Sequence, residues 1–115
     1  MAVKDLTPVQ AGFNKITKVA GESASSASDG FKLVIPEADE YLFLLAENTH
    51  TSTAYKVTVK APTKQGYAST DEDLELQLDA GEKAIIRVES ARFANTDGTI
   101  NITVGNTAVK VVAVY

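Results

Sequence analysis

Cysteine and tryptophan are absent from this sequence of 115 residues, and histidine and methionine each occur once. A chain without cysteine has no disulfides, thiolate metal sites or cysteine nucleophiles, and the single His50 excludes a multi-histidine metal centre. No run approaches the roughly 18 apolar residues of a membrane helix, and Met1–Gln10 lacks the apolar core of a secretory signal. We therefore expect no bound cofactor, no membrane segment and no export signal.

Basic residues are also in the minority. Fifteen acids oppose 11 lysines and arginines, which leaves a formal net charge of −4. Recognition of nucleic acids needs an excess of Lys and Arg over the contact surface, so we expect no nucleic-acid partner. The apolar share of 44% is ordinary for a globular protein, and this length fits one domain that builds its own core.

Short alternating runs of polar and apolar residues are abundant instead. They cover 31–35, 55–59, 74–78, 84–88, 99–104 and 107–114. Tyr41–Ala46 is continuously apolar, which predicts a central strand buried on both faces. Turn signals at Gly81, Asp97-Gly98 and Gly105-Asn106 separate the runs, the last as a two-residue hairpin loop. Seven or eight strands at this spacing predict an all-β antiparallel sandwich, Ig-like or jelly-roll-like.

The first thirty residues carry weaker signals. We interpret 1–13 as an irregular N-terminal arm, because Gly12 opposes a helix over Leu6, Val9 and Phe13. A short strand is expected over 14–19 and a flexible loop over the small, polar residues 20–30. The sandwich domain thus spans 14–115. An arm that orders on binding can cover a large partner surface, which makes Leu6, Val9 and Phe13 candidate partner-binding residues.

Acidic residues cluster in two places. Six acids fall within 71–82, and Asp71–Asp73 are consecutive. A calcium site, a contact for a basic partner and a solvated strand edge all remain open, although the spacing is not that of an EF-hand and the alternation favours the edge. The other cluster is Glu37, Asp39 and Glu40. Nothing sets two of these acids opposite one another, as glycoside hydrolysis requires, so we expect no enzyme.

The remaining candidate functional residues are two lysines, one histidine and one arginine. Lys56 and Lys60 share one face of a strand and form either a solvated face or a contact for an acidic partner, such as a second copy. His50 lies in a polar loop and is expected at the surface. Arg92 lies in 89–93, which interrupts the strand pattern. It either caps a structural corner or offers an exposed partner contact.

These residues also carry a family resemblance. The runs Leu76–Glu82, Ile85-Ile86, Glu89–Phe93 and Asp97–Ile102 resemble small β-sandwich head decoration or accessory capsid proteins of tailed bacteriophages and prophages. The resemblance extends over Phe31–Val114 and leaves residues 1–30 and Asp71–Asp73 unmatched. It implies a non-enzymatic virion component made in the host cytoplasm, with the major capsid protein or other virion proteins as partners.

Two other functions stay open at this point. A tail or cell-surface β-sandwich that binds carbohydrate or protein would need a groove lined by Tyr41, Tyr55 or Tyr67. An enzyme would need a convergent acid–base pair with perturbed ionisation. The virion function predicts self-association into a homo-oligomer or binding to an assembled shell.

Overall fold

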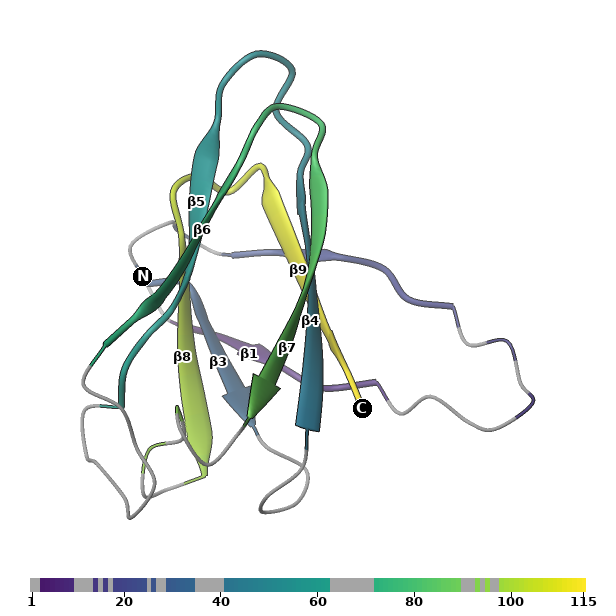
Figure 1. The fold of residues 1–115 in the computed structure, drawn as a ribbon, viewed down its shortest axis with the longest axis vertical. Helices are drawn as coiled ribbons and strands as arrows, with labels where there is room; N and C mark the ends of the chain where they lie inside the picture. The colour runs from purple at the N-terminus through teal and green to yellow at the C-terminus, as the bar shows by residue number, and fades with distance from the viewer. Residues whose placement is uncertain are drawn as a thin grey trace.

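Two facing β-sheets make up the computed structural model of this chain (Figure 1). The structure describes residues 3–9, 14, 16, 18–24, 26, 29–34, 41–62, 72–89, 93, 95 and 98–115. Within these ranges it has nine strands: β1 (Lys4–Leu6), β2 (Glu22–Ser23), β3 (Phe31–Val34), β4 (Tyr41–Asn48), β5 (Tyr55–Val59), β6 (Leu74–Leu78), β7 (Lys83–Glu89), β8 (Thr99–Val104) and β9 (Val109–Val114). The predicted all-β sandwich is confirmed.

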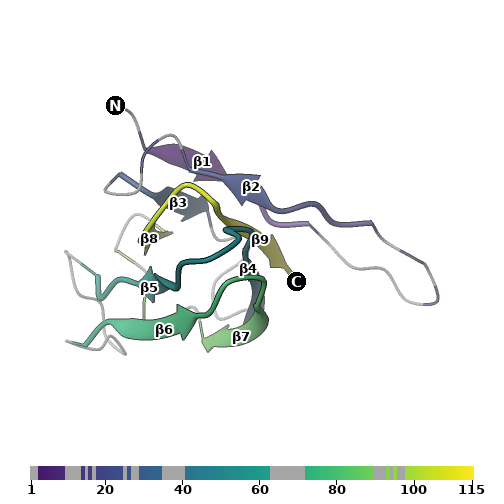
Figure 2. The same cartoon turned by 90° about the horizontal axis from the view of Figure 1, so that it is seen from above.

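The two sheets divide the strands five to four. One sheet has the order β1-β3-β8-β5-β6 and the other the order β2-β9-β4-β7. Pairing is antiparallel throughout, except that β1 runs parallel to β3. Seen from above, β1 and β2 lie at one margin of the sandwich, and β6 and β7 lie at the other (Figure 2). Each margin therefore brings together one edge strand from each sheet.

Alternation along the strands supplies the core between the sheets. In β3, Phe31 and Leu33 are fully buried while Lys32 and Val34 are exposed, as a strand with one face inward requires. The five-stranded sheet also contributes Leu6, Val57, Val59, Leu78, Ile100, Ile102 and Val104, and the four-stranded sheet contributes Leu42, Leu44, Ala46, Val88, Val109, Val111 and Ala113. The valine and isoleucine side chains among them are β-branched and pack well on pleated surfaces.

The turn between β6 and β7 carries the chain from one sheet to the other. Glu82 N–H donates to the Asp79 carbonyl at 2.9 Å, and Gly81 has a φ of 79°, a value that glycine adopts without steric cost. Gly81 N–H donates to the Asn48 carbonyl at 2.9 Å, and Asn48 N–H donates to the Glu82 carbonyl at 3.0 Å. Gly81 and Glu82 thus both oppose Asn48, and this arrangement is a β-bulge at the start of β7.

Asn48 is the buried polar residue at the centre of this arrangement, with no exposed surface. Its Nδ2 donates to the carbonyls of Thr53 at 2.8 Å and Leu78 at 3.0 Å, and its Oδ1 accepts from His50 N–H at 3.0 Å. A buried amide is tolerated when its hydrogen-bonding groups are paired. The side chain therefore joins β4, the following loop and β6, and links the two sheets.

The N-terminal prediction was wrong where the structure describes it. Lys4–Leu6 is a strand, not an irregular arm, and Leu6 is fully buried in the core. Lys4 Nζ donates to the Ser23 carbonyl at 3.0 Å and so links β1 to β2. The predicted loop over 20–30 contains β2, which pairs with β9. Of the expected strand over 14–19, the described residues 14, 16, 18 and 19 are not extended in a sheet.

Two further predictions need correction. Strand β4 is buried on one face only, because Phe43 is 37% exposed while Leu42 and Leu44 are inaccessible. The expected two-residue loop at Gly105-Asn106 is the first half of a four-residue connection. Val109 N–H donates to the Asn106 carbonyl at 3.1 Å, and the Asn106 Oδ1 accepts from Ala108 N–H at 2.9 Å. The side chain of Asn106 therefore replaces the tight glycine turn that the pattern favours.

A candidate docking surface on the four-stranded sheet

Three rows of side chains cross the outer face of the four-stranded sheet. The strand register places Ile85, Leu45 and Val112 in one row, Arg87, Phe43 and Val114 in the next, and Lys83, Glu47 and Lys110 in the third. We call these nine residues the outer face. Two of the rows are predominantly apolar, although they lie on the side of the sheet away from the core.

The apolar rows are partly open to solvent. Ile85 is 65% exposed and Phe43 is 37% exposed, whereas Val112 is only 6% exposed. The Arg87 guanidinium carbon lies 5.9 Å from the centroid of the Phe43 ring, within the range of a cation–π contact. Apolar surface of this kind, bordered by charge, is characteristic of protein docking surfaces.

The third row is charged and alternates in sign. Glu47 lies between Lys83 on β7 and Lys110 on β9, and Lys83 Nζ is 3.9 Å from the Glu47 carboxylate. Opposite charges at directly opposed positions stabilise a sheet by about 0.2–1 kcal/mol per pair. This row therefore closes one end of the apolar surface with a polar border.

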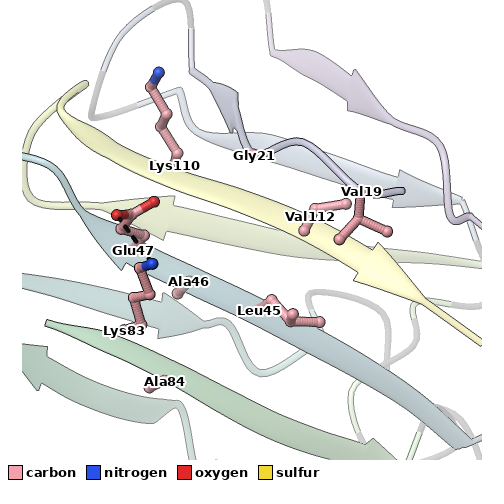
Figure 3. Close-up of a pocket in the computed structure, with 9 residues that line it drawn as sticks. All are labelled: Val19, Gly21, Leu45, Ala46, Glu47, Lys83, Ala84, Lys110 and Val112. Carbon is pink, nitrogen blue, oxygen red and sulfur yellow. Dashed lines mark ion pairs between the residues drawn. The ribbon is translucent and has the colours of Figure 1, made fainter. Parts of the chain in front are cut away.

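A hollow of about 230 Å³ lies between the apolar and charged rows (Figure 3). The segment before β2 forms one wall, since Val19 lies beside Val112 and a Cβ at Gly21 would come within 2.8 Å of the Lys110 Cβ. The lining comprises Val19, Gly21, Leu45, Ala46, Glu47, Lys83, Ala84, Lys110 and Val112. Small-molecule sites usually measure roughly 300–1,000 Å³, so this hollow is smaller than most of them.

Of the predicted arm residues, the described Leu6 and Val9 contact the sandwich itself. Leu6 belongs to the core, and Val9 is tied into the sandwich by a parallel bridge to Val114. Val9 N–H donates to the Ala113 carbonyl at 2.8 Å, and its carbonyl accepts from Tyr115 N–H at 3.0 Å. Phe13 and Arg92 lie outside the described residues.

The two predicted lysines pair with acids on the neighbouring strand or beside it. Lys56 Nζ lies 3.5 Å from Glu75, and both side chains are more than half exposed. Lys60 Nζ lies 3.1 Å from Asp73, whose other oxygen accepts from Ala61 N–H at 2.6 Å. The hydrogen bond from Ala61, followed by that from Lys60, lowers the pKa of Asp73 below its ordinary value of 3.8. These contacts belong to the solvated edge that the alternation favoured.

Within the described part of the chain, the acidic clusters form no candidate metal site. Asp71, Glu37, Asp39 and Glu40 lie outside it, and the described residues contain no group of three or more potential metal ligands. Nor does any described helix have the length and apolarity needed to cross a membrane.

His50 has a structural role in its loop. Its Nδ1 accepts from the backbone N–H groups of Ser52 at 3.2 Å and Thr53 at 3.1 Å. Its ring meets Tyr55 edge-on at 5.4 Å between centroids. Tyr55 therefore packs against its own loop, and Tyr67, another residue of the hypothetical ligand groove, lies outside the described residues.

The outer face was not predicted, although the sequence contains a signal for it. In both Tyr41–Ala46 and Ala84–Ile86, apolar residues occupy positions where strict alternation requires polar ones. A continuous apolar run ordinarily predicts a strand that is buried on both faces. An apolar outward face on two neighbouring strands is the alternative that the structure reveals.

Comparison with known proteins returned no relative. No family model, no curated protein and no solved structure matches this chain.

Proposed function

We propose that this protein is a non-enzymatic accessory protein of a tailed-phage head, which docks on the assembled capsid through its outer face. The major capsid protein is the partner that binds this outer face. The resemblance carried by 31–114 supports this assignment.

The main supporting observation is that the apolar rows of the outer face expose Ile85 (65%) and Phe43 (37%) on neighbouring strands. Apolar side chains on the outward side of a sheet add nothing to the sandwich core, and their exposure to water is unfavourable. Coverage by a partner removes that cost. The charged row at one end of the outer face supplies the polar rim that protein interfaces usually have.

Peptide mass spectrometry of phage particles purified from the source strain tests the role directly. We expect this protein at a copy number comparable to that of the major capsid protein. A few copies per particle would move the assignment to the neck or tail. Absence from every particle would refute the virion role and favour a binding module for a soluble carbohydrate or protein.

A matched pair of variants tests the surface. Ile85→Asp places a charge in the apolar row and is expected to reduce the occupancy of the protein on particles about tenfold or more. Val34→Asp is the control, because Val34 is 49% exposed on the five-stranded sheet. Equal loss of occupancy in both variants would show that the outer face is not the docking surface.

A further inference from the structure

Strand β7 is an edge strand of the four-stranded sheet. Its only partner among the described strands is β4, and Figure 2 shows β7 at the margin of the sandwich. The opposite margin is joined across the sheets by Lys4, which bonds to Ser23. An unpaired edge presents a row of backbone donors and acceptors to any strand that can align with it.

The register identifies which residues carry those groups. Asn48 N–H bonds to the Glu82 carbonyl, and hydrogen-bonded pairs alternate along an antiparallel ladder. Ala84, Ile86 and Val88 therefore bond to β4. The backbone groups of positions 83, 85, 87 and 89 point to the open edge, and the side chains of Lys83, Ile85 and Arg87 belong to the outer face.

A second copy of β7 can meet this edge through a two-fold axis in only a few registers. Hydrogen bonding requires positions 83, 85, 87 and 89 of one copy to oppose members of the same set in the other. An axis at Ile85 sets Lys83 opposite Arg87, and an axis at Arg87 sets that residue opposite itself. Both registers place like charges in direct opposition, which destabilises a sheet.

An axis at Ile86 has no such conflict. It sets position 85 opposite 87 and position 83 opposite 89, so that a lysine and a glutamate occupy opposed positions on both sides of the axis. Ile85 then lies beside the aliphatic stem of Arg87 from the other copy. The register makes about eight backbone hydrogen bonds, two for each opposed pair.

We propose that β7 is a self-pairing edge, through which two copies of this protein join their four-stranded sheets into one eight-stranded sheet, with the two-fold axis at Ile86. The two outer faces then form one continuous surface. The inference does not rest on the phage assignment, because it follows from the register and charge of β7 alone.

Sedimentation velocity from micromolar to millimolar concentration tests the proposal. We expect a monomer–dimer equilibrium for the unmodified protein. Lys83→Glu and Glu89→Lys each place like charges in opposition at two symmetric positions, and each is expected to raise the Kd about tenfold. The double variant restores opposite charges and is expected to return the Kd to within about threefold of the original value.

Lys110→Glu is the matched control. Lys110 and Lys83 flank the same glutamate in the charged row, but only Lys83 lies on the open edge. A change of less than about threefold is expected for Lys110→Glu. The proposal is overturned by a monomer at every concentration, by single variants without effect, by an equal effect of Lys110→Glu, or by a double variant that stays weak.

Hydrogen exchange of the unmodified protein gives an independent reading that needs no variant. The amides of Ile85 and Arg87 point to the edge and should gain protection as the concentration rises. The amides of Ala84 and Ile86 bond to β4 and should be protected at every concentration. Edge amides that exchange equally fast at low and high concentration would overturn the self-pairing.

Discussion

The Asn48 Nδ2 donates to the Leu78 carbonyl at 3.0 Å and thereby joins the two sheets through a hydrogen bond between β4 and β6. The same nitrogen bonds to the Thr53 carbonyl at 2.8 Å. Since the side chain is fully buried, no water replaces a lost partner. This amide joins the loop that follows β4 to the end of β6.

Replacement of Asn48 by Asp is expected to lower the free energy of unfolding by roughly 3 kcal/mol or more, because the buried Leu78 carbonyl and the partly buried Thr53 carbonyl lose their donor and face a carboxylate. Urea unfolding measures the change. Asn106→Asp is the control and should change stability by less than about 0.5 kcal/mol. Its Oδ1 accepts a hydrogen bond from Ala108 N–H, which a carboxylate accepts equally well. A loss below about 1 kcal/mol for Asn48→Asp would contradict the assigned role.

Asp73 should make the stability depend on pH at the acidic end. Its folded pKa is lowered by the hydrogen bonds from Ala61 and Lys60. Its charged form is therefore favoured by folding, and this contribution is complete above the ordinary pKa of 3.8 and is lost as the pH falls through the folded value. The Tm of Asp73→Asn should be lower than that of the unmodified protein at pH 7, and the two values should converge at strongly acidic pH.

The matched variant for this titration is Glu75→Gln, since Glu75 pairs with Lys56 at 3.5 Å but is 54% exposed. Such an exposed pair contributes little, so its Tm difference should be small at every pH. A difference for Asp73→Asn that does not change with pH would show that the carboxylate charge is not the cause.

Leu6→Ala tests whether β1 belongs to the folded domain. Because Leu6 is fully buried, its truncation is expected to cost about 2–4 kcal/mol. Val3→Ala, at a position 44% exposed, should cost less than about 0.5 kcal/mol. Both values come from denaturant unfolding. If the two costs were equal and small, β1 would not be part of the cooperative core.

Gly30→Ala is expected to disrupt the sandwich. Gly30 has a φ of 61°, and an added Cβ would clash with the Ile102 carbonyl oxygen and the Thr103 backbone. Gly98 has a φ of 81° but open space around it, so Gly98→Ala isolates the backbone cost, about 1 kcal/mol. We expect Gly30→Ala to cost several times more, measured by thermal unfolding. Equal costs would show that the β3–β8 pair adjusts to the added methyl group.

The sequence predicts the long strands well, because each needs only local alternation. The period of two predicts Phe31–Val34, Tyr55–Val59 and Thr99–Val104. The strands β1 and β2 are three and two residues long, which is too short for a period to be read. β1 and β2 form because the edges of β3 and β9 are available for pairing. Pairing between segments that lie far apart in the sequence leaves no local pattern.

The candidate surface was harder to predict than the fold. The weak strand pattern around Leu6 and Val9 favours a partner contact for both, yet Leu6 is buried in the core and Val9 bridges to Val114 on β9. The apolar run that contains Phe43 and Leu45 predicts an interior position for both, because such a run does not indicate which of its faces is covered. Only the position of β4 in a sheet with one open side decides the question.

The bridge between Val9 and Val114 has a consequence for how the chain folds during synthesis. Val9 is translated more than a hundred residues before Val114, and β2 likewise cannot pair until β9 has been synthesised. Neither segment can reach its final place until β9 has left the ribosome. The high contact order that results predicts slow folding, in the range of milliseconds to seconds. Nascent chains of this protein therefore lack the pairings of Val9 and β2 until β9 has been synthesised.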